Sequence, residues 1–207
     1  MRKVVAFFCL VLFLLPGTAA AEWQFAPFVG LTFRGSTSIV DIETVNDKPA
    51  SERVHKHFGG SVSFLGGGIL GAEAIFTWTP GFFEQEDLEL VESSRSIALM
   101  GNLVVTAPRR LTEYSLRPFV SGGFGVLKPY VRLTPVGGTE PLPVVDLNLW
   151  GYNIGGGAVG FLSQRTGVRF DLRYYSTVRP TDEGGVPIED RVRLRYMTAS
   201  VGVVIRR

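Results

Sequence analysis

Short segments in which apolar and polar residues alternate recur along this chain of 207 residues. The clearest lies at 167–178, where Val168, Phe170 and Leu172 alternate with charged residues. A period of two predicts a β-strand with two chemically different faces. The same reasoning predicts eight strands, at 23–34, 58–65, 69–78, 94–106, 117–131, 148–162, 167–178 and 191–207.

The connections between these segments alternate between long and short. Connections of 12 to 23 residues occupy 35–57, 79–93, 132–147 and 179–190, and connections of 3 to 10 residues occupy 66–68, 107–116 and 163–166. This asymmetry is typical of an up-and-down barrel in an outer membrane, with long loops outside the cell and tight turns in the periplasm. The sequence therefore predicts an all-β fold, an eight-stranded antiparallel up-and-down transmembrane β-barrel. An even strand number places both termini on the periplasmic side.

The first 21 residues have the pattern of a secretory signal peptide. Arg2 and Lys3 precede an apolar run from Val4 to Leu15, and small residues end the segment at Thr18-Ala19-Ala20-Ala21. The run is shorter than the roughly 20 residues of a membrane-spanning helix, so we expect cleavage rather than anchoring. The mature barrel domain then covers 22–207, and bacterial export is implied.

Charge and cysteine content exclude several classes of protein. Of 21 basic residues, Arg2 and Lys3 leave with the leader, so 19 basic residues face 19 acidic ones. A balanced mature chain predicts no nucleic-acid partner. The only cysteine, Cys9, lies in the leader, so we expect no disulfide.

The charged face of each strand indicates which side meets the lumen. In a membrane barrel the apolar face meets lipid and the polar face lines the interior. Glu73 in the third strand and the seventh-strand charges then point inward from opposite sides. We predict a lumen charge network that plugs the narrow bore of an eight-stranded barrel. Its members are Arg34, Glu73, Arg169, Asp171 and Arg173.

Aromatic residues cluster near the ends of the predicted strands, as expected for girdles at two membrane interfaces. The inner girdle is predicted to contain Trp23, Phe25, Phe64, Phe119, Phe161 and Phe170, and the outer girdle Phe33, Phe58, Trp78, Trp150, Tyr152 and Tyr174. A soluble, lipocalin-like barrel is the alternative, and it would turn this apolar face inward.

Several segments carry a family resemblance that covers the whole mature chain. They are Pro27-Phe28-Val29-Gly30, Thr79-Pro80-Gly81-Phe82-Phe83, Met100-Gly101-Asn102-Leu103-Val104-Val105, Arg117-Pro118-Phe119-Val120-Ser121-Gly122-Gly123-Phe124-Gly125 and Asn153-Ile154-Gly155-Gly156-Gly157. With them the chain resembles the small outer-membrane β-barrel proteins of Gram-negative-type bacteria, of OmpA-like or porin-like layout. The resemblance implies outer-membrane lipid and, during biogenesis, the barrel-assembly machinery as partners. The ligand of the outer loops is not specified by this resemblance.

The sequence favours a non-enzymatic outer-membrane protein with a structural or surface-interaction role. A narrow pore or small-solute channel is one alternative, and a lipid-modifying outer-membrane enzyme is another. His55 and His57 fall in the first predicted loop, where two histidines without a third ligand make a poor metal site. No Ser-His-acid arrangement is evident. We therefore predict no catalytic residue, metal or cofactor.

Overall fold

A closed β-barrel makes up the described part of the chain. The computed structural model describes residues 22–38, 54–65, 69–83, 91–108, 116–133, 145–178 and 193–207. The predicted leader at 1–21 and most of the predicted long loops lie outside these residues. Within the described ranges, no helix has the length and hydropathy needed to cross a membrane.

The strands agree with the predicted ones to within a few residues. They are β1 (Glu22–Ser38), β2 (His55–Leu65), β3 (Leu70–Pro80), β4 (Val91–Thr106), β5 (Leu116–Leu133), β6 (Val145–Asp146), β7 (Leu149–Phe161), β8 (Thr166–Thr177) and β9 (Arg193–Arg206). The two residues of β6 pair with β5 just beyond the pairing of β7 with the same strand. β6 and β7 therefore occupy one position, and the barrel has eight strand positions as the sequence predicts.

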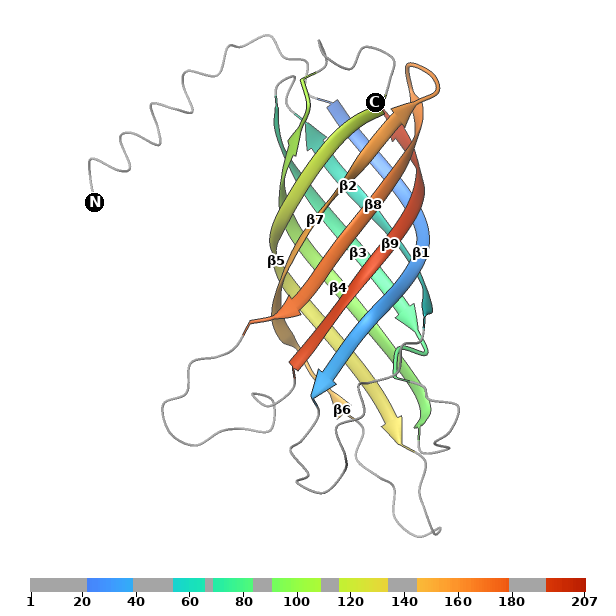
Figure 1. Ribbon diagram of the computed structural model, residues 1–207, viewed down its shortest axis with the longest axis vertical. Helices are drawn as coiled ribbons and strands as arrows, with labels where there is room; N and C mark the ends of the chain where they lie inside the picture. The colour runs from blue at the N-terminus through green and yellow to red at the C-terminus, as the bar shows by residue number, and fades with distance from the viewer. Residues whose placement is uncertain are drawn as a thin grey trace, which may run out of the picture.

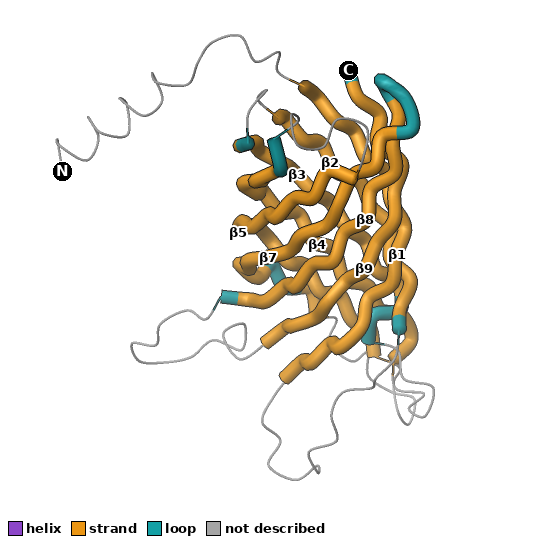
Figure 2. The backbone as a smooth tube through the Cα atoms, turned by 45° about the horizontal axis from the view of Figure 1, so that its top comes forward, coloured by secondary structure: helices purple, strands orange, loops and turns teal. Residues whose placement is uncertain are grey.

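Every pairing around the barrel is antiparallel, and β1 closes it against β9. Laterally paired residues lead from Phe25 around all eight positions and return to β1 at Ser36. Because the circuit returns at a different height, the strands must tilt strongly against the barrel axis. This tilt is visible in Figure 1, and Figure 2 shows the closed ring from a raised angle.

The two ends of the barrel differ. β1 begins and β9 ends at one end, where the described turn 162–165 joins β7 to β8 (Figure 1). We call this the termini end. The connections from β1 to β2, β3 to β4, β5 to β6 and β8 to β9 leave the opposite end, which we call the loop end. The connections predicted to be long therefore leave the loop end, and those predicted to be short leave the termini end.

Large apolar side chains cover the outside of the barrel. On β1, Trp23, Phe25 and Val29 are exposed, while Gln24 and Ala26, which alternate with them, are buried. The same alternation continues around the barrel; for example, Phe170 and Leu172 are exposed on β8. The soluble alternative, with the apolar face inside, is therefore wrong for the architecture.

Four sequence assignments are wrong in position. Phe119 is 6% exposed and lies inside the barrel, not in an outer girdle. Phe161 also packs inward, against the apolar cluster at the termini end. The strand β2 begins at His55, so His55 and His57 lie in a strand rather than in the first loop. Gly59 and Gly60, near the start of β2, are paired with both β1 and β3.

Candidate functional site: the lumen charge network

The centre of the lumen contains four ionised side chains in mutual contact. Glu73 projects from β3, and Arg169, Asp171 and Arg173 project from alternate positions of β8. β3 and β8 lie on opposite sides of the closed ring, with three strand positions between them in either direction. Successive side chains of a strand point to opposite faces, so the period of two on β8 directs all three charges inward.

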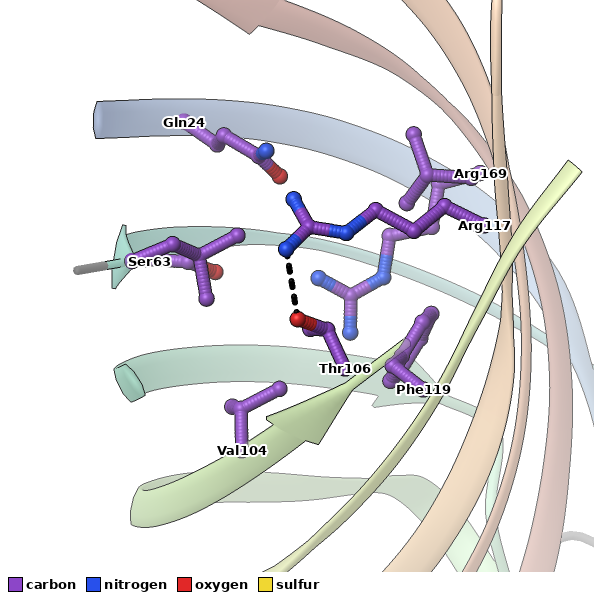
Figure 3. A pocket seen from close by; sticks show the side chains of 9 residues that line it. Gln24, Ser63, Val104, Thr106, Arg117, Phe119 and Arg169 are labelled. Carbon is purple, nitrogen blue, oxygen red and sulfur yellow. Dashed lines mark hydrogen bonds between the residues drawn. The ribbon is translucent and has the colours of Figure 1, made fainter. Parts of the chain in front are cut away.

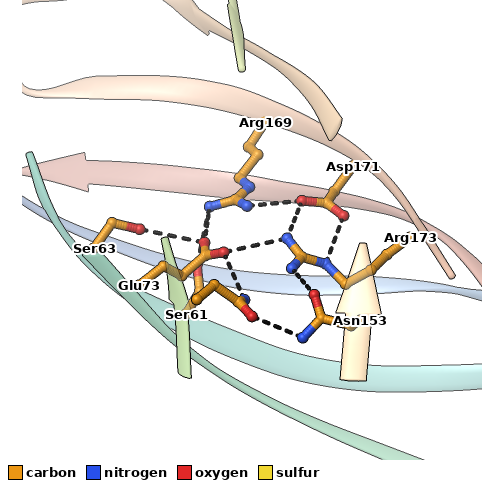
Figure 4. A network of polar contacts seen from close by, with 8 residues as sticks. Ser61, Ser63, Glu73, Asn153, Arg169, Asp171 and Arg173 are labelled. Atoms are coloured by element: carbon orange, nitrogen blue, oxygen red, sulfur yellow. Dashed lines mark hydrogen bonds and ion pairs between the residues drawn. The ribbon is translucent and has the colours of Figure 1, made fainter. Parts of the chain in front are cut away.

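The four charges form a closed ring of ion pairs (Figure 4). Arg169 Nη1 lies 2.5 Å from Glu73 Oε1, and Arg169 Nη2 lies 2.7 Å from Asp171 Oδ2. Arg173 Nη2 completes the ring at 3.2 Å from Glu73 Oε2 and 3.0 Å from Asp171 Oδ2. Two cations and two anions balance, so the buried network carries no net charge. Such pairing is required when ions are removed from water.

Neutral side chains add further hydrogen bonds to the network. Arg173 Nη1 donates to Asn153 Oδ1 at 2.7 Å, and Asn153 Nδ2 donates to Asn102 Oδ1 at 2.7 Å. Asn102 Nδ2 in turn donates to Glu73 Oε2 at 3.3 Å. These side-chain hydrogen bonds connect the paired strands β3 and β4 to the paired strands β7 and β8 across the lumen. The two asparagines were not among the sequence-predicted members.

Glycines on β7 leave room for the β8 charges. Gly155 pairs with Arg173, and Gly157 pairs with Asp171. A Cβ atom at Gly155 would lie 3.0 Å from the Arg173 Cβ, and one at Gly157 would lie 1.8 Å from the Phe170 carbonyl oxygen. The glycine-rich segment of β7 therefore allows β8 to approach closely with its long side chains in the lumen.

Clusters of apolar side chains lie in the lumen on both sides of the network. The cluster nearer the loop end has three aromatic members in contact: Tyr175 stacks on Tyr196 at 4.8 Å between ring centroids, and Phe82 meets Tyr196 edge-on at 5.1 Å. The cluster nearer the termini end contains Ala26, Leu65, Val104, Phe119, Val159 and Val204. The guanidinium of Arg169 lies over the ring of Phe119 at 4.4 Å. The lumen is therefore layered, with charges between two apolar clusters.

A small internal cavity of about 20 Å³ lies between the network and the termini end. Arg117 and Arg169 both extend toward it, and Gln24, Ser63 and Thr106 line it (Figure 3). This volume is about that of one water molecule.

The structure brings together four of the five residues assigned to the network from the sequence. The fifth, Arg34, lies in β1, but its side chain is outside the described residues. Of the aromatic residues assigned to the girdles, Trp23, Trp78, Trp150 and Tyr152 are all exposed on the outer surface. The described residues contain no cluster of three or more His, Cys, Asp or Glu that is suited to a metal ion. His57 is buried, with its Nδ1 atom 3.2 Å from Thr32 Oγ1.

Comparison with known proteins assigns the fold. No family model matches the sequence, and no curated protein is significantly similar to it. Among solved structures, the outer membrane protein OprG from Pseudomonas aeruginosa matches with a TM-score of 0.60 at 12% identity, covering 92% of this chain and 98% of OprG. Neisserial surface protein A matches with a TM-score of 0.56 at 13% identity, covering 90% and 98%. The N-terminal β-barrel domain of Pseudomonas aeruginosa OprF matches with a TM-score of 0.52 at 12% identity, covering 90% and 97%.

These likenesses define the class of architecture. The chain is a closed eight-stranded antiparallel barrel with the fold of the small bacterial outer-membrane proteins. At this level of identity the likeness concerns the fold, and the site must be interpreted from its own geometry.

Proposed function

We propose that this protein is an integral outer-membrane barrel whose lumen is plugged by its own side chains and whose role is structural or surface-interacting. The observation that carries the proposal is the inversion of the barrel: the Glu73–Arg173 network is buried while Trp, Phe and Leu side chains cover the outside. A water-soluble barrel would expose the charges and bury the apolar residues. The observed arrangement, with charges inside and apolar residues outside, is stable if hydrocarbon surrounds the barrel.

The exposed aromatic residues support an orientation along the membrane normal. Trp23 lies at the termini end of β1, whereas Trp78 and Trp150 lie toward the loop end of β3 and β7. Aromatic residues favour both membrane interfaces, so two levels of exposed tryptophan match two interfaces. In this proposal the loop end faces outward and both termini face the periplasm.

Single cysteines test the orientation, because Cys9 in the predicted leader is the only native cysteine. Val54 is exposed at the loop end, and Ser163 lies in the turn at the termini end. On intact cells, a membrane-impermeant maleimide is expected to label Val54→Cys and not Ser163→Cys. Both should react after cell lysis. Labelling of Ser163→Cys alone on intact cells would reverse the orientation, and recovery of the protein in the soluble fraction would refute the membrane location.

The network supports a closed lumen rather than a narrow pore. Arg173 is 1% exposed and bonds partners on both sides of the lumen, so its side chain occupies the space that an ion would need. In planar bilayers we expect no steady conductance from the purified protein. Regular conductance steps that disappear in Glu73→Ala or Arg173→Ala would favour the pore instead.

No catalytic role is part of this proposal. Acyl transfer by a triad requires a histidine that is hydrogen-bonded to a nucleophile and oriented by an acid. His57 Nδ1 lies 3.2 Å from the Thr32 hydroxyl, but among the described residues no carboxylate is hydrogen-bonded to the His57 ring to orient it, and His55 stacks on Phe82 at 6.0 Å. Incubation with radiolabelled lipid A tests this point, and a product that requires either histidine would revive the enzymatic alternative.

A further inference from the structure

Three basic residues gather on the outside of the barrel at its loop end. Arg95 on β4 and Arg132 on β5 are exposed, and Lys128 on β5 is partly exposed. We call these three residues the basic patch. They occupy outward-facing positions because their strand neighbours, among them Ser96 and Val131, are buried in the lumen.

Strand pairing holds the patch together. Arg95 pairs with Tyr130, and Lys128 and Arg132 flank Tyr130 at the two nearest outward positions of β5. The Arg95 guanidinium lies over the Tyr130 ring, 4.6 Å from its centroid. Outward positions on one strand are spaced by roughly 7 Å, so the three cations fall within a surface area of headgroup size.

The patch has a net positive charge. Lys128 Nζ forms an ion pair with Asp146 Oδ1 at 3.2 Å, and the two side chains are 42% and 46% exposed. Within the described part of the chain, neither Arg95 nor Arg132 lies within ion-pair distance of a carboxylate. Among the described residues, three cations and one anion therefore give the patch a net charge of +2.

The patch lies just beyond the exposed aromatic residues. Trp78 pairs with Ile97, two residues from Arg95, and Trp150 pairs with Val126, two residues from Lys128. Each tryptophan is thus one outward position closer to the barrel centre than the adjoining cation. Aromatic rings mark the interface, and cations immediately beyond it meet charged headgroups.

We propose that the basic patch binds the phosphate groups of a bisphosphorylated glycolipid headgroup, that of lipid A, at the outer surface. This inference rests on the proposed outer-membrane location and orientation. Two uncompensated arginines on adjacent strands match a headgroup with two phosphates better than a headgroup with one. Arginine also forms bidentate hydrogen bonds with phosphate oxygens.

The test compares two double variants of the full mature protein. Arg95→Gln/Arg132→Gln removes the uncompensated patch charges and leaves Lys128 with Asp146. Arg165→Gln/Arg207→Gln is the matched control, because both residues are exposed at the termini end and the net charge changes equally. Binding is measured as the shift of the unfolding midpoint on titrating phosphatidylcholine vesicles with lipid A. Each cation near an anionic surface contributes about 1 kcal/mol, so the patch variant should bind lipid A about 25-fold more weakly while the control matches the unchanged protein.

Vesicles of other compositions distinguish binding of lipid A phosphates from a general attraction to anionic lipid. Dephosphorylated lipid A should give no shift, and phosphatidylglycerol at equal charge density should give a much smaller one. Equal shifts with phosphatidylglycerol, or equal losses in both double variants, would overturn the inference. Insertion into pure phosphatidylcholine is checked first by heat-dependent gel migration. Failure to insert contradicts the proposed function, whereas insertion without a lipid A dependence contradicts only the role of the patch.

Discussion

The guanidinium of Arg173 reaches the carboxylate of Glu73 across the barrel, with Nη2 3.2 Å from Oε2, although 100 residues separate them in the sequence. Their strands lie on opposite sides of the ring and share no backbone hydrogen bonds. The contact therefore connects the two halves of the barrel through the lumen. Its energetic value depends on the balance between desolvation and pairing in a site with little water.

Removing one anion from the network should strongly destabilise the barrel. Glu73→Ala leaves Arg169 and Arg173 to share Asp171, so one buried positive charge is uncompensated. We expect a loss of about 3–5 kcal/mol in the free energy of unfolding, measured by urea titration in lipid vesicles. The double variant Glu73→Leu/Arg169→Leu retains one neutral Asp171–Arg173 pair and should recover much of that loss. A double variant no more stable than the single one would show that charge balance is not the cause.

A cation placed on the outer wall should be tolerated according to its depth. Ala74 faces outward near the middle of β3, and Leu162 is 80% exposed in the turn at the termini end. Ala74→Arg should cost about 2–4 kcal/mol in vesicles, and Leu162→Arg about 0–1 kcal/mol, because hydrocarbon penalises charge most at the midplane. Unfolding titrations of both variants provide the comparison. Equal stabilities would contradict a lipid-facing wall at Ala74.

The alternation of residues on β8 was sufficient to predict the inward face of that strand. Arg169, Asp171 and Arg173 differ so sharply from Phe170 and Leu172 that the period of two assigns both faces. The position of Glu73 opposite them followed from counting strands around an eight-stranded ring. Fold and central charges were therefore within reach of the sequence.

The apolar layers of the lumen could not be predicted from the sequence. Phe119 has the residue type of a girdle, and residue type alone does not distinguish a ring in lipid from a ring beneath Arg169. Phe119 lies two residues from both Arg117 and Ser121, so it shares a face of β5 with these polar residues. Both are buried, and their position in the sequence could have indicated that Phe119 points into the lumen. Asn102 and Asn153 likewise required the lateral register, because only the pairing of β4, β5 and β7 brings their amides within 2.7 Å.

Two outwardly similar glycines should respond differently to alanine. A Cβ atom at Gly123 would lie 1.9 Å from the Gly101 carbonyl oxygen and 2.5 Å from Asn102 Oδ1, whereas one at Gly101 would meet nothing closer than 3.9 Å. Gly123→Ala should therefore lower the free energy of unfolding by about 1–3 kcal/mol or more, since backbone must move. Gly101→Ala should be neutral or slightly stabilising, because it restricts the unfolded chain. Urea unfolding measures both, and a similar effect at the two sites would contradict the close approach of β4 and β5.

Phe82 should stabilise the loop end of the barrel. Its removal should not open the lumen to ions. The turn after β3 directs this ring inward, with Gly81 at a φ of 67°, and Phe82 meets Phe83 and Tyr196 edge-on. Phe82→Ala should lose about 3–5 kcal/mol of stability, as buried phenylalanines do. Leu162→Ala, at an exposed apolar position, is the control and should lose little. If the charge network closes the lumen as proposed, planar bilayers should still show no steady conductance for Phe82→Ala, because Arg173 and its partners lie beneath the aromatic layer. Conductance appearing in this variant alone would assign closure of the lumen to the aromatic cluster rather than to the charge network.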